Sequence, residues 1–138
     1  MKTPRGIRNN NPLNIRKGDK WKGMAEIQQD ECFVQFMSMR WGIRAAFIIL
    51  HRYMTIHKLN TIRGIISRWA PENENNTQAY IAYVSRETGI HPDSELVYFD
   101  MQAMVRLVKA MAYVENGQAI DQVDIIAGYA LFTKDIGG

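Results

Sequence analysis

Apolar side chains recur at intervals of three and four residues through most of the chain after Trp41. This spacing places them on one face of an α-helix, so it predicts amphipathic helices packed around a core. Capping residues and helix breakers divide the pattern into segments. The predicted N-caps are Asn60, Asn76 or Thr77, and Asp100, and the predicted stops are Pro71, Gly89 and Gly117. The predicted helices cover residues 41–57, 61–70, 77–88, 101–116 and 122–132.

The chain before Trp41 lacks this helical periodicity. Residues 1–20 are predicted to form a loop with a short extended piece at residues 13–16. Residues 21–37 predict a small β-hairpin, with one strand beginning at Ile27, a turn at residues 28–30 and a second strand at residues 33–36. Because there is no linker, internal repeat or low-complexity tract, the sequence predicts one domain over residues 1–138. Its class is mainly α, with one hairpin (α+β).

Composition supports a globular domain, because 46% of the 138 residues are apolar. The net charge of +3 permits an anionic polymer as partner, such as nucleic acid or the bacterial cell wall. Cys32 is the sole cysteine, so no intramolecular disulfide can form, and its apolar neighbours predict a buried thiol. The sequence has no membrane-length apolar stretch and no signal-peptide core, so we expect synthesis in the cytoplasm.

Several chemistries lack the residues that they need. The histidines, His51, His57 and His91, do not have metal-site spacing, and no serine lies in a glycine-flanked elbow. There is no phosphate-binding glycine loop, so we expect neither a metal nor a nucleotide cofactor. The basic run around Trp21 could contact nucleic acid, but a solvated loop explains it equally well, and nucleic acid is not an expected partner.

Residues 5–16 contain three consecutive asparagines, and a fourth asparagine, Asn14, lies two positions after Pro12. Asparagine amides favour turns and offer both donors and an acceptor. Two interpretations stay open. The segment could form an amide-lined wall for a hydroxyl-rich or amide-rich ligand, or it could be a loop held by Asx turns.

Glu115 is the strongest candidate for an acid catalyst. It follows the apolar residues 111–114 and directly precedes Asn116-Gly117, where a helix is predicted to end. The partial negative charge of a helix C-terminus, together with burial, would favour the protonated carboxyl that a general acid needs. The alternative is an exposed glutamate at a frayed helix end. The rival acids are Glu26, Glu31, Glu72 and Glu74.

A set of motifs covers nearly the whole chain. They are Arg5-Gly6-Ile7-Arg8-Asn9-Asn10-Asn11-Pro12, Asn14-Ile15-Arg16, Trp21-Lys22-Gly23, Phe33-Val34-Gln35-Phe36, Trp41-Gly42-Ile43-Arg44-Ala45, Arg68-Trp69-Ala70-Pro71 and Glu115-Asn116-Gly117. In this order they resemble a phage- and prophage-encoded family. Its members are described as virion structural proteins or as lysozyme-like peptidoglycan-degrading proteins. Leu13 departs from the family pattern, which has glycine there.

A second resemblance concerns mechanism. The segment from Asn11 to Phe36 is similar to the β-lobe of glucosaminidases and lytic transglycosylases of lysozyme-like fold. In these enzymes the catalytic glutamate ends a helix that precedes the β-lobe. Here only residues 1–4 precede the motif that begins at Arg5 and runs into this segment. The resemblance therefore implies a lysozyme-like domain, possibly circularly permuted, in which the helix ending at Glu115 supplies the acid.

These resemblances imply cleavage of peptidoglycan glycan strands by a lytic transglycosylase, muramidase or glucosaminidase, with Glu115 as general acid and base. The expected substrate-binding residues are Asn11, Asn14, Trp21, Glu74, Asn75, Thr77, Tyr80 and Tyr83. For the aromatic residues, core packing is the favoured alternative. The alternative function is a non-catalytic virion protein of lysozyme-like shape that binds glycan or other virion proteins. Either protein would be made in the host cytoplasm, be associated with the virion and act at the bacterial cell wall. A DNA-contacting structural protein fits the modest charge poorly.

Overall fold

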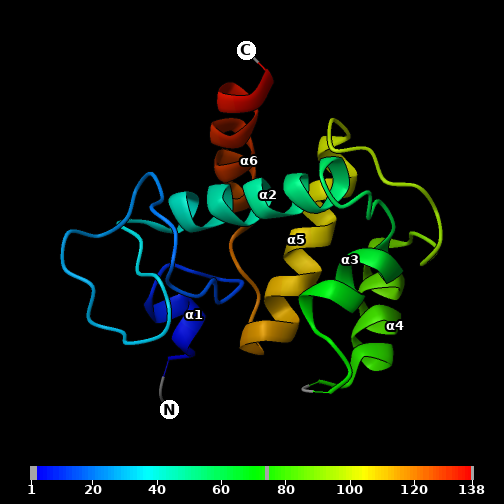
Figure 1. The fold of residues 1–138 in the computed structure, drawn as a ribbon, viewed down its shortest axis with the longest axis horizontal. Coiled ribbons are helices and arrows are strands. Elements are labelled where there is room, and N and C mark those ends of the chain that lie inside the picture. The colour runs from blue at the N-terminus through cyan, green and yellow to red at the C-terminus, as the bar shows by residue number, and fades with distance from the viewer. Residues whose placement is uncertain (1–2, 74, 138) are drawn as a thin grey trace.

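The structure is a computed structural model that describes residues 3–73 and 75–137. Six helices follow one another in this part of the chain: α1 (Arg5–Arg8), α2 (Met39–Thr55), α3 (Ile62–Trp69), α4 (Thr77–Thr88), α5 (Met101–Asn116) and α6 (Gln122–Gly137). In Figure 1, α2 crosses the molecule, and α5 lies between the N-terminal segment and the pair α3 and α4. The mainly helical class is confirmed.

Local capping explains where the helices begin. Asn76 caps α4 as predicted, because its side-chain oxygen accepts a hydrogen bond from the amide of Ala79 (3.2 Å). The cap of α3 is Thr61 rather than the predicted Asn60, and its hydroxyl accepts from the amide of Gly64 (3.0 Å). Both caps satisfy an amide that the first helical turn leaves free.

Two helices differ from the prediction. The single-turn helix α1 lies where a loop was predicted, because four residues are too few to show helical periodicity. Helix α6 continues to Gly137 instead of ending at Phe132. No helix in the described ranges has both the length and the apolar run that crossing a membrane requires.

The hairpin predicted for residues 21–37 is not formed. Single antiparallel bridges instead join Arg16 to Phe33 and Met24 to Phe36, so the segment between the two phenylalanines has a neighbour on each side. Beyond these bridges, residues 3–73 and 75–137 contain no regular strand. One bridging partner lies before the predicted hairpin, so a local two-strand pattern could not reveal it.

Side chains do much of the pairing in the N-terminal lobe, which we define as residues 3–38. The side-chain amide nitrogen of Gln28 donates to the backbone carbonyls of Ala25 (2.9 Å) and Gln35 (2.8 Å). The side-chain oxygen of Gln28 accepts a hydrogen bond from the backbone N–H of Gln35 (2.8 Å). The predicted burial of Cys32 is wrong, because its side chain is exposed. Its backbone amide instead donates to Asp30 in an Asx-type turn (2.9 Å).

The crossing of α2 and α6 forms the centre of the core. The Phe47 ring meets the Tyr129 ring edge to face, with 5.1 Å between centroids, and stacks on Phe132 at 5.7 Å. A Cβ atom at Gly128 would collide with Ile43, so only glycine permits this close approach of the two helices.

A partly buried ion pair reinforces the same crossing. Arg44 on α2 is 7% exposed, and its guanidinium contacts the Asp135 carboxylate of α6 at 2.8 and 2.9 Å. Lys22 of the N-terminal lobe contacts the same carboxylate at 3.2 Å. The hydrogen bond from Arg44 is the first cause of the lowered pKa of Asp135. One carboxylate thus joins α2, α6 and the lobe.

Asp30 provides a pH-dependent link within the lobe. Hydrogen bonds from the backbone amides of Cys32 and Phe33, then from the Asn9 side chain, lower its pKa from 3.8 to about 2. A carboxyl group whose pKa is lower in the folded than in the unfolded state stabilises the fold at pH values above its unfolded-state pKa. This contribution is lost as the pH falls from about 4 toward 2.

We therefore expect the free energy of unfolding to fall between about pH 4 and pH 2, and to fall less steeply in Asp30→Asn. Urea unfolding followed by tryptophan fluorescence at several pH values measures both slopes. The matched control is Glu26→Gln, whose side chain is exposed. Equal slopes for the wild type and Asp30→Asn would contradict the assignment.

Candidate functional site

Glu115 lies in the last turn of α5, where Gly117 ends the helix in the left-handed conformation (φ +67°). Its half-buried carboxylate accepts two hydrogen bonds from distant parts of the chain. The Asn14 amide donates to one oxygen (3.3 Å), and the Tyr80 hydroxyl donates to the other (3.1 Å). The N-terminal lobe, α4 and α5 therefore converge on Glu115.

Asn14 is held by an unusual turn. Its φ is +54°, a left-handed conformation that asparagine adopts more readily than most residues. The preceding Asn11 is fully buried, and its amide donates to the carbonyls of Ile15 and Val34 (2.9 Å each), while its oxygen accepts from the Ile15 amide (2.9 Å). Asn11 thus builds the turn that presents Asn14 to Glu115.

The geometry of this turn also explains why Leu13 can stand where the family pattern has glycine. Leu13 has no positive φ, and its side chain is 1% exposed in the core. The left-handed positions are Asn10 and Asn14 on either side of it. A leucine at this position therefore contributes packing without straining the backbone.

Tyr80 reaches Glu115 from a buried position on α4. Burial first, and the neighbouring Glu115 charge second, raise the pKa of the Tyr80 hydroxyl far above its ordinary value. The hydroxyl therefore keeps its proton and acts as a donor. It lies near the Met111 carbonyl as well (3.4 Å), which also positions it against α5.

Asn116 ties the end of α5 to the lobe, a role that the sequence interpretation missed. Its amide donates to the carbonyls of Pro12 (2.8 Å) and Ala112 (2.9 Å), and it is buried. A Cβ atom at Gly6 would collide with its side-chain oxygen, so α1 also packs directly on it. The signal in the sequence was a polar residue at a helix end beside an otherwise apolar stripe.

The other predicted residues of α4 and the loop before it do not join this group. Thr77 is buried, and its hydroxyl donates to the Ala70 carbonyl, which fastens the loop. Asn75 is exposed, and its amide contacts the Pro71 carbonyl (3.3 Å). Glu74 lies outside the described residues.

Two predicted binding residues, Asn11 and Trp21, are enclosed by the protein. Asn11 has its amide and its oxygen engaged within the turn. Trp21 is 9% exposed, and the Arg52 guanidinium lies over its ring, 5.3 Å from the centroid. Most of the indole surface is therefore used in core packing.

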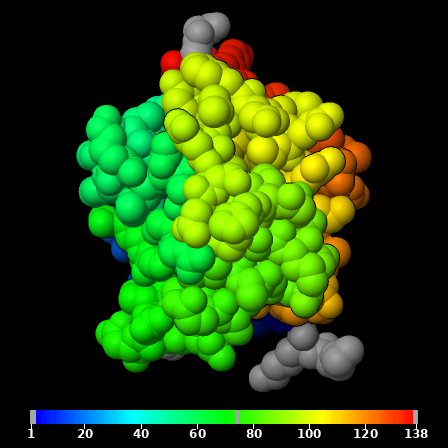
Figure 2. Space-filling model, turned by 90° about the vertical axis from the view of Figure 1, so that its right-hand side faces the viewer, coloured from blue at the N-terminus to red at the C-terminus, as the bar shows by residue number. Residues whose placement is uncertain are grey.

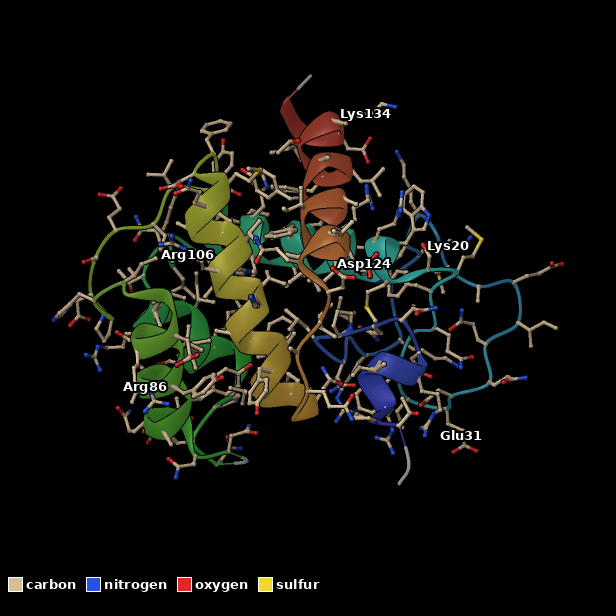
Figure 3. All side chains as sticks on the ribbon, turned by 180° about the vertical axis from the view of Figure 1, so that it is seen from behind. Lys20, Glu31, Arg86, Arg106, Asp124 and Lys134 are labelled. Atoms are coloured by element: carbon tan, nitrogen blue, oxygen red, sulfur yellow. The ribbon has the colours of Figure 1, made fainter. Side chains whose placement is uncertain are left out.

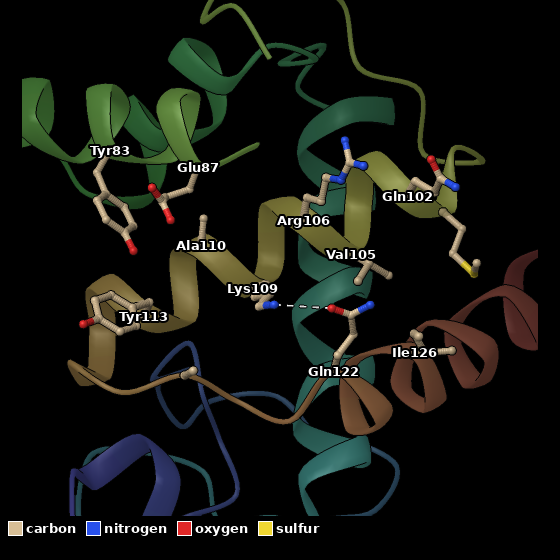
Figure 4. A pocket seen from close by; sticks show the side chains of 12 residues that line it. Tyr83, Glu87, Gln102, Val105, Arg106, Lys109, Ala110, Tyr113, Gln122 and Ile126 are labelled. Carbon is tan, nitrogen blue, oxygen red and sulfur yellow. Dashed lines mark hydrogen bonds between the residues drawn. The ribbon is translucent and has the colours of Figure 1, made fainter. Parts of the chain in front are cut away.

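Tyr83 lies in a different place from Glu115. It lines a groove of about 860 Å³ between α4, α5 and α6, and Glu115 is not among the lining residues. Figure 4 shows Tyr83 and Glu87 of α4 pointing toward α5, and Gln122 of α6 meeting Lys109. The predicted binding residues thus divide between two locations.

The described residues contain no group of three or more histidine, cysteine, aspartate or glutamate side chains placed to hold a metal ion. The groups that meet at Glu115 are its carboxyl group, the Asn14 amide and the Tyr80 phenolic hydroxyl. Such a group can exchange a proton and bind hydroxyl or amide groups.

The chain is similar to Protein P5 of Pseudoalteromonas phage PM2. The two are 42% identical over 117 residues, which cover 82% of this chain and 71% of that protein. The chain belongs to the Protein P5 family. No protein-family profile matches it. The phage origin expected from the sequence motifs is thereby confirmed at the level of a phage protein family.

The turn at Asn14 gives a direct test of how this member of the Protein P5 family builds its site. Asn14→Ala and Asn14→Gly both remove the amide that donates to Glu115, but only glycine accepts φ +54° without cost. We expect the alanine variant to be less stable than the glycine variant by about 1 kcal/mol. Urea unfolding measures the difference, and an alanine variant as stable as the glycine variant would contradict the turn geometry.

Proposed function

We propose that this chain is a component of a phage particle. The observation that carries the proposal is its membership in a phage protein family, over most of both chains. In this role the domain would contact other phage proteins or the bacterial cell wall. A lysozyme-like shape, which the sequence resemblance implied, belongs to the same proposal.

Particles purified after induction of the genetic element that encodes this chain should contain the full-length chain. Mass spectrometry of gradient-purified particles, before and after a high-salt wash, measures its amount per particle. The matched control is a lysate in which particle assembly is blocked, where the chain should not sediment. A chain that stays in the supernatant of intact particles would overturn the proposal.

We propose a second function, cleavage of peptidoglycan glycan strands, because one specific observation favours it. Glu115, Asn14 and Tyr80 come from three separate parts of the chain and meet at one carboxylate. A helix-end glutamate beside an amide-bearing segment is also what the resemblance to lysozyme-like enzymes implied. The family relationship supports the particle role more directly, since it links the chain to a phage and not to a reaction.

The chemistry would need only one acid. A protonated Glu115 would give its proton to the glycosidic oxygen as the bond from that oxygen to the sugar C1 breaks. The resulting carboxylate would then take the proton of the muramyl 6-hydroxyl, whose oxygen attacks C1 and closes an anhydro ring. A hydrolase would instead add water at C1, and the usual mechanisms use a second carboxylate for that step.

Substrate binding would have to rearrange the contacts of Glu115. Both carboxylate oxygens accept hydrogen bonds within the protein, so one donor must be released before a sugar oxygen can approach. Asn14 is suited to this exchange, because its side-chain oxygen is buried without a hydrogen-bond partner among the described residues. Release of the Asn14 side chain from Glu115 would expose that oxygen, and an N-acetyl N–H of the glycan would then donate to it.

We expect the wild type to clear a suspension of purified cell walls and Glu115→Gln to do so at least about 100-fold more slowly. Glutamine keeps the shape of the side chain but cannot deliver a carboxyl proton. Glu31→Gln, which removes an exposed carboxylate, is the matched control. Mass spectrometry of the soluble muropeptides separates anhydro products from reducing ends.

Equal activity of the wild type and Glu115→Gln would remove the catalytic assignment. Absence of activity in both, on walls of several types, would remove the enzyme proposal and leave the particle role. The two proposals can therefore fail independently.

A further inference from the structure

The groove between α4, α5 and α6 has the size of a ligand site, at about 860 Å³. Figure 3 shows Arg106 on the exposed side of α5, with Arg86 on the neighbouring α4 and Lys134 at the far end of α6. Figure 2 faces α3, α4 and the loop that leads to α5, which together form a continuous surface. Glu115 is not among the residues that line the groove.

Two tyrosines form a platform at one end of the groove. The rings of Tyr83 and Tyr113 are nearly parallel, with 5.8 Å between centroids and 16° between planes. The Arg86 guanidinium lies over the Tyr83 ring, 5.4 Å from its centroid. Tyr113 remains 43% exposed. A sugar ring can therefore stack on Tyr113, as apolar sugar faces do on aromatic side chains.

Two cations lie in the middle of the groove. Arg106 and Lys109 are one helical turn apart on α5 and both are exposed. No carboxylate in the described ranges forms an ion pair with either one. Within the described part of the chain, Lys109 donates only to the neutral side-chain oxygen of Gln122 (3.3 Å). The two charges are free to bind carboxylates of a ligand.

The other residues that line the groove argue against two classes of ligand, a nucleic acid and an amphipathic helix. Glu87 lies beside the tyrosines, where its charge contributes to the raised pKa of Tyr83 after burial of the ring. A nucleic acid stacked on the tyrosines would bring phosphates toward that carboxylate. An amphipathic helix needs a continuous apolar stripe, whereas the exposed apolar residues Met101 and Ile126 gather at the other end, beyond the cations.

We propose that this groove binds the peptide-bearing glycan strand of peptidoglycan. A sugar would stack on Tyr113 while Glu87 accepts hydrogen bonds from its hydroxyl groups, and Arg106 and Lys109 would hold the carboxylates of a peptide stem. This inference rests on the proposed action at the cell wall. It adds a binding site that holds the strand on the face of α5 lined by Tyr113 and Arg106.

The test uses isothermal titration of the full chain with soluble muropeptides that carry free carboxylates, and with neutral chitotetraose. We expect Arg106→Gln with Lys109→Gln to raise the Kd for muropeptides by about tenfold or more and to leave chitotetraose binding unchanged. Tyr113→Ala should weaken both ligands. The matched control is Arg40→Gln with Lys134→Gln, which removes the same charge from exposed positions outside the groove.

The outcomes separate this inference from the proposed function. Muropeptide binding that is unchanged in the Arg106 and Lys109 variant overturns the groove assignment, whatever the activity of Glu115. Binding should survive in Glu115→Gln, because Glu115 does not line the groove. If polyglutamate or single-stranded DNA binds the groove more tightly than muropeptides do, the ligand class is wrong. If the wild type binds no wall fragment, the action at the wall falls with it.

Discussion

The hydrogen bond from the Asn116 amide to the Pro12 carbonyl joins the end of α5 to the N-terminal lobe, and the arrangement of the site depends on it. The two residues are 104 positions apart in sequence, so folding must close a long loop before this contact forms. Once formed, the contact places Glu115, which directly precedes Asn116, beside the turn at Asn14. Gly6 permits the close approach, since a side chain there would collide with Asn116. The candidate site is therefore a property of the assembled domain and not of either segment alone.

The helical part of the fold could be predicted from sequence because its signals are local. The apolar stripe on α5, its N-cap Asp100 and its C-cap Gly117 all lie within one short segment of sequence, so each could be predicted locally. The lobe could not be predicted in the same way. The bridge from Arg16 to Phe33 joins residues on either side of Trp21, and the Gln28 side-chain amide takes the place of a strand partner. Such side-chain pairing leaves no period in the sequence.

The candidate site was predictable in part for a similar reason. The meeting of Glu115 with the Asn14 segment followed from resemblance to enzymes in which a helix-end acid faces this segment, and the contact is present. The roles of these residues stay predictions. Asn11 and Trp21 share the same motifs but are buried, and composition alone cannot tell a ligand-facing amide from one that builds a turn. Asn116 was missed because its backbone position suggested only a helix end.

Glu115 and Tyr113 share the last turn of α5 but point to different neighbours, because residues two apart on a helix lie on opposite faces. On α4, Tyr80 contacts Glu115 and Tyr83 stacks on Tyr113. The contact between α4 and α5 therefore positions both the Glu115 carboxylate and the tyrosine platform of the groove. A change that shifts α4 against α5 would alter the hydrogen bond to Glu115 and the tyrosine platform together. Substitutions confined to the outer ends of Arg106 and Lys109 leave this helix contact intact, so their effects report on the groove alone.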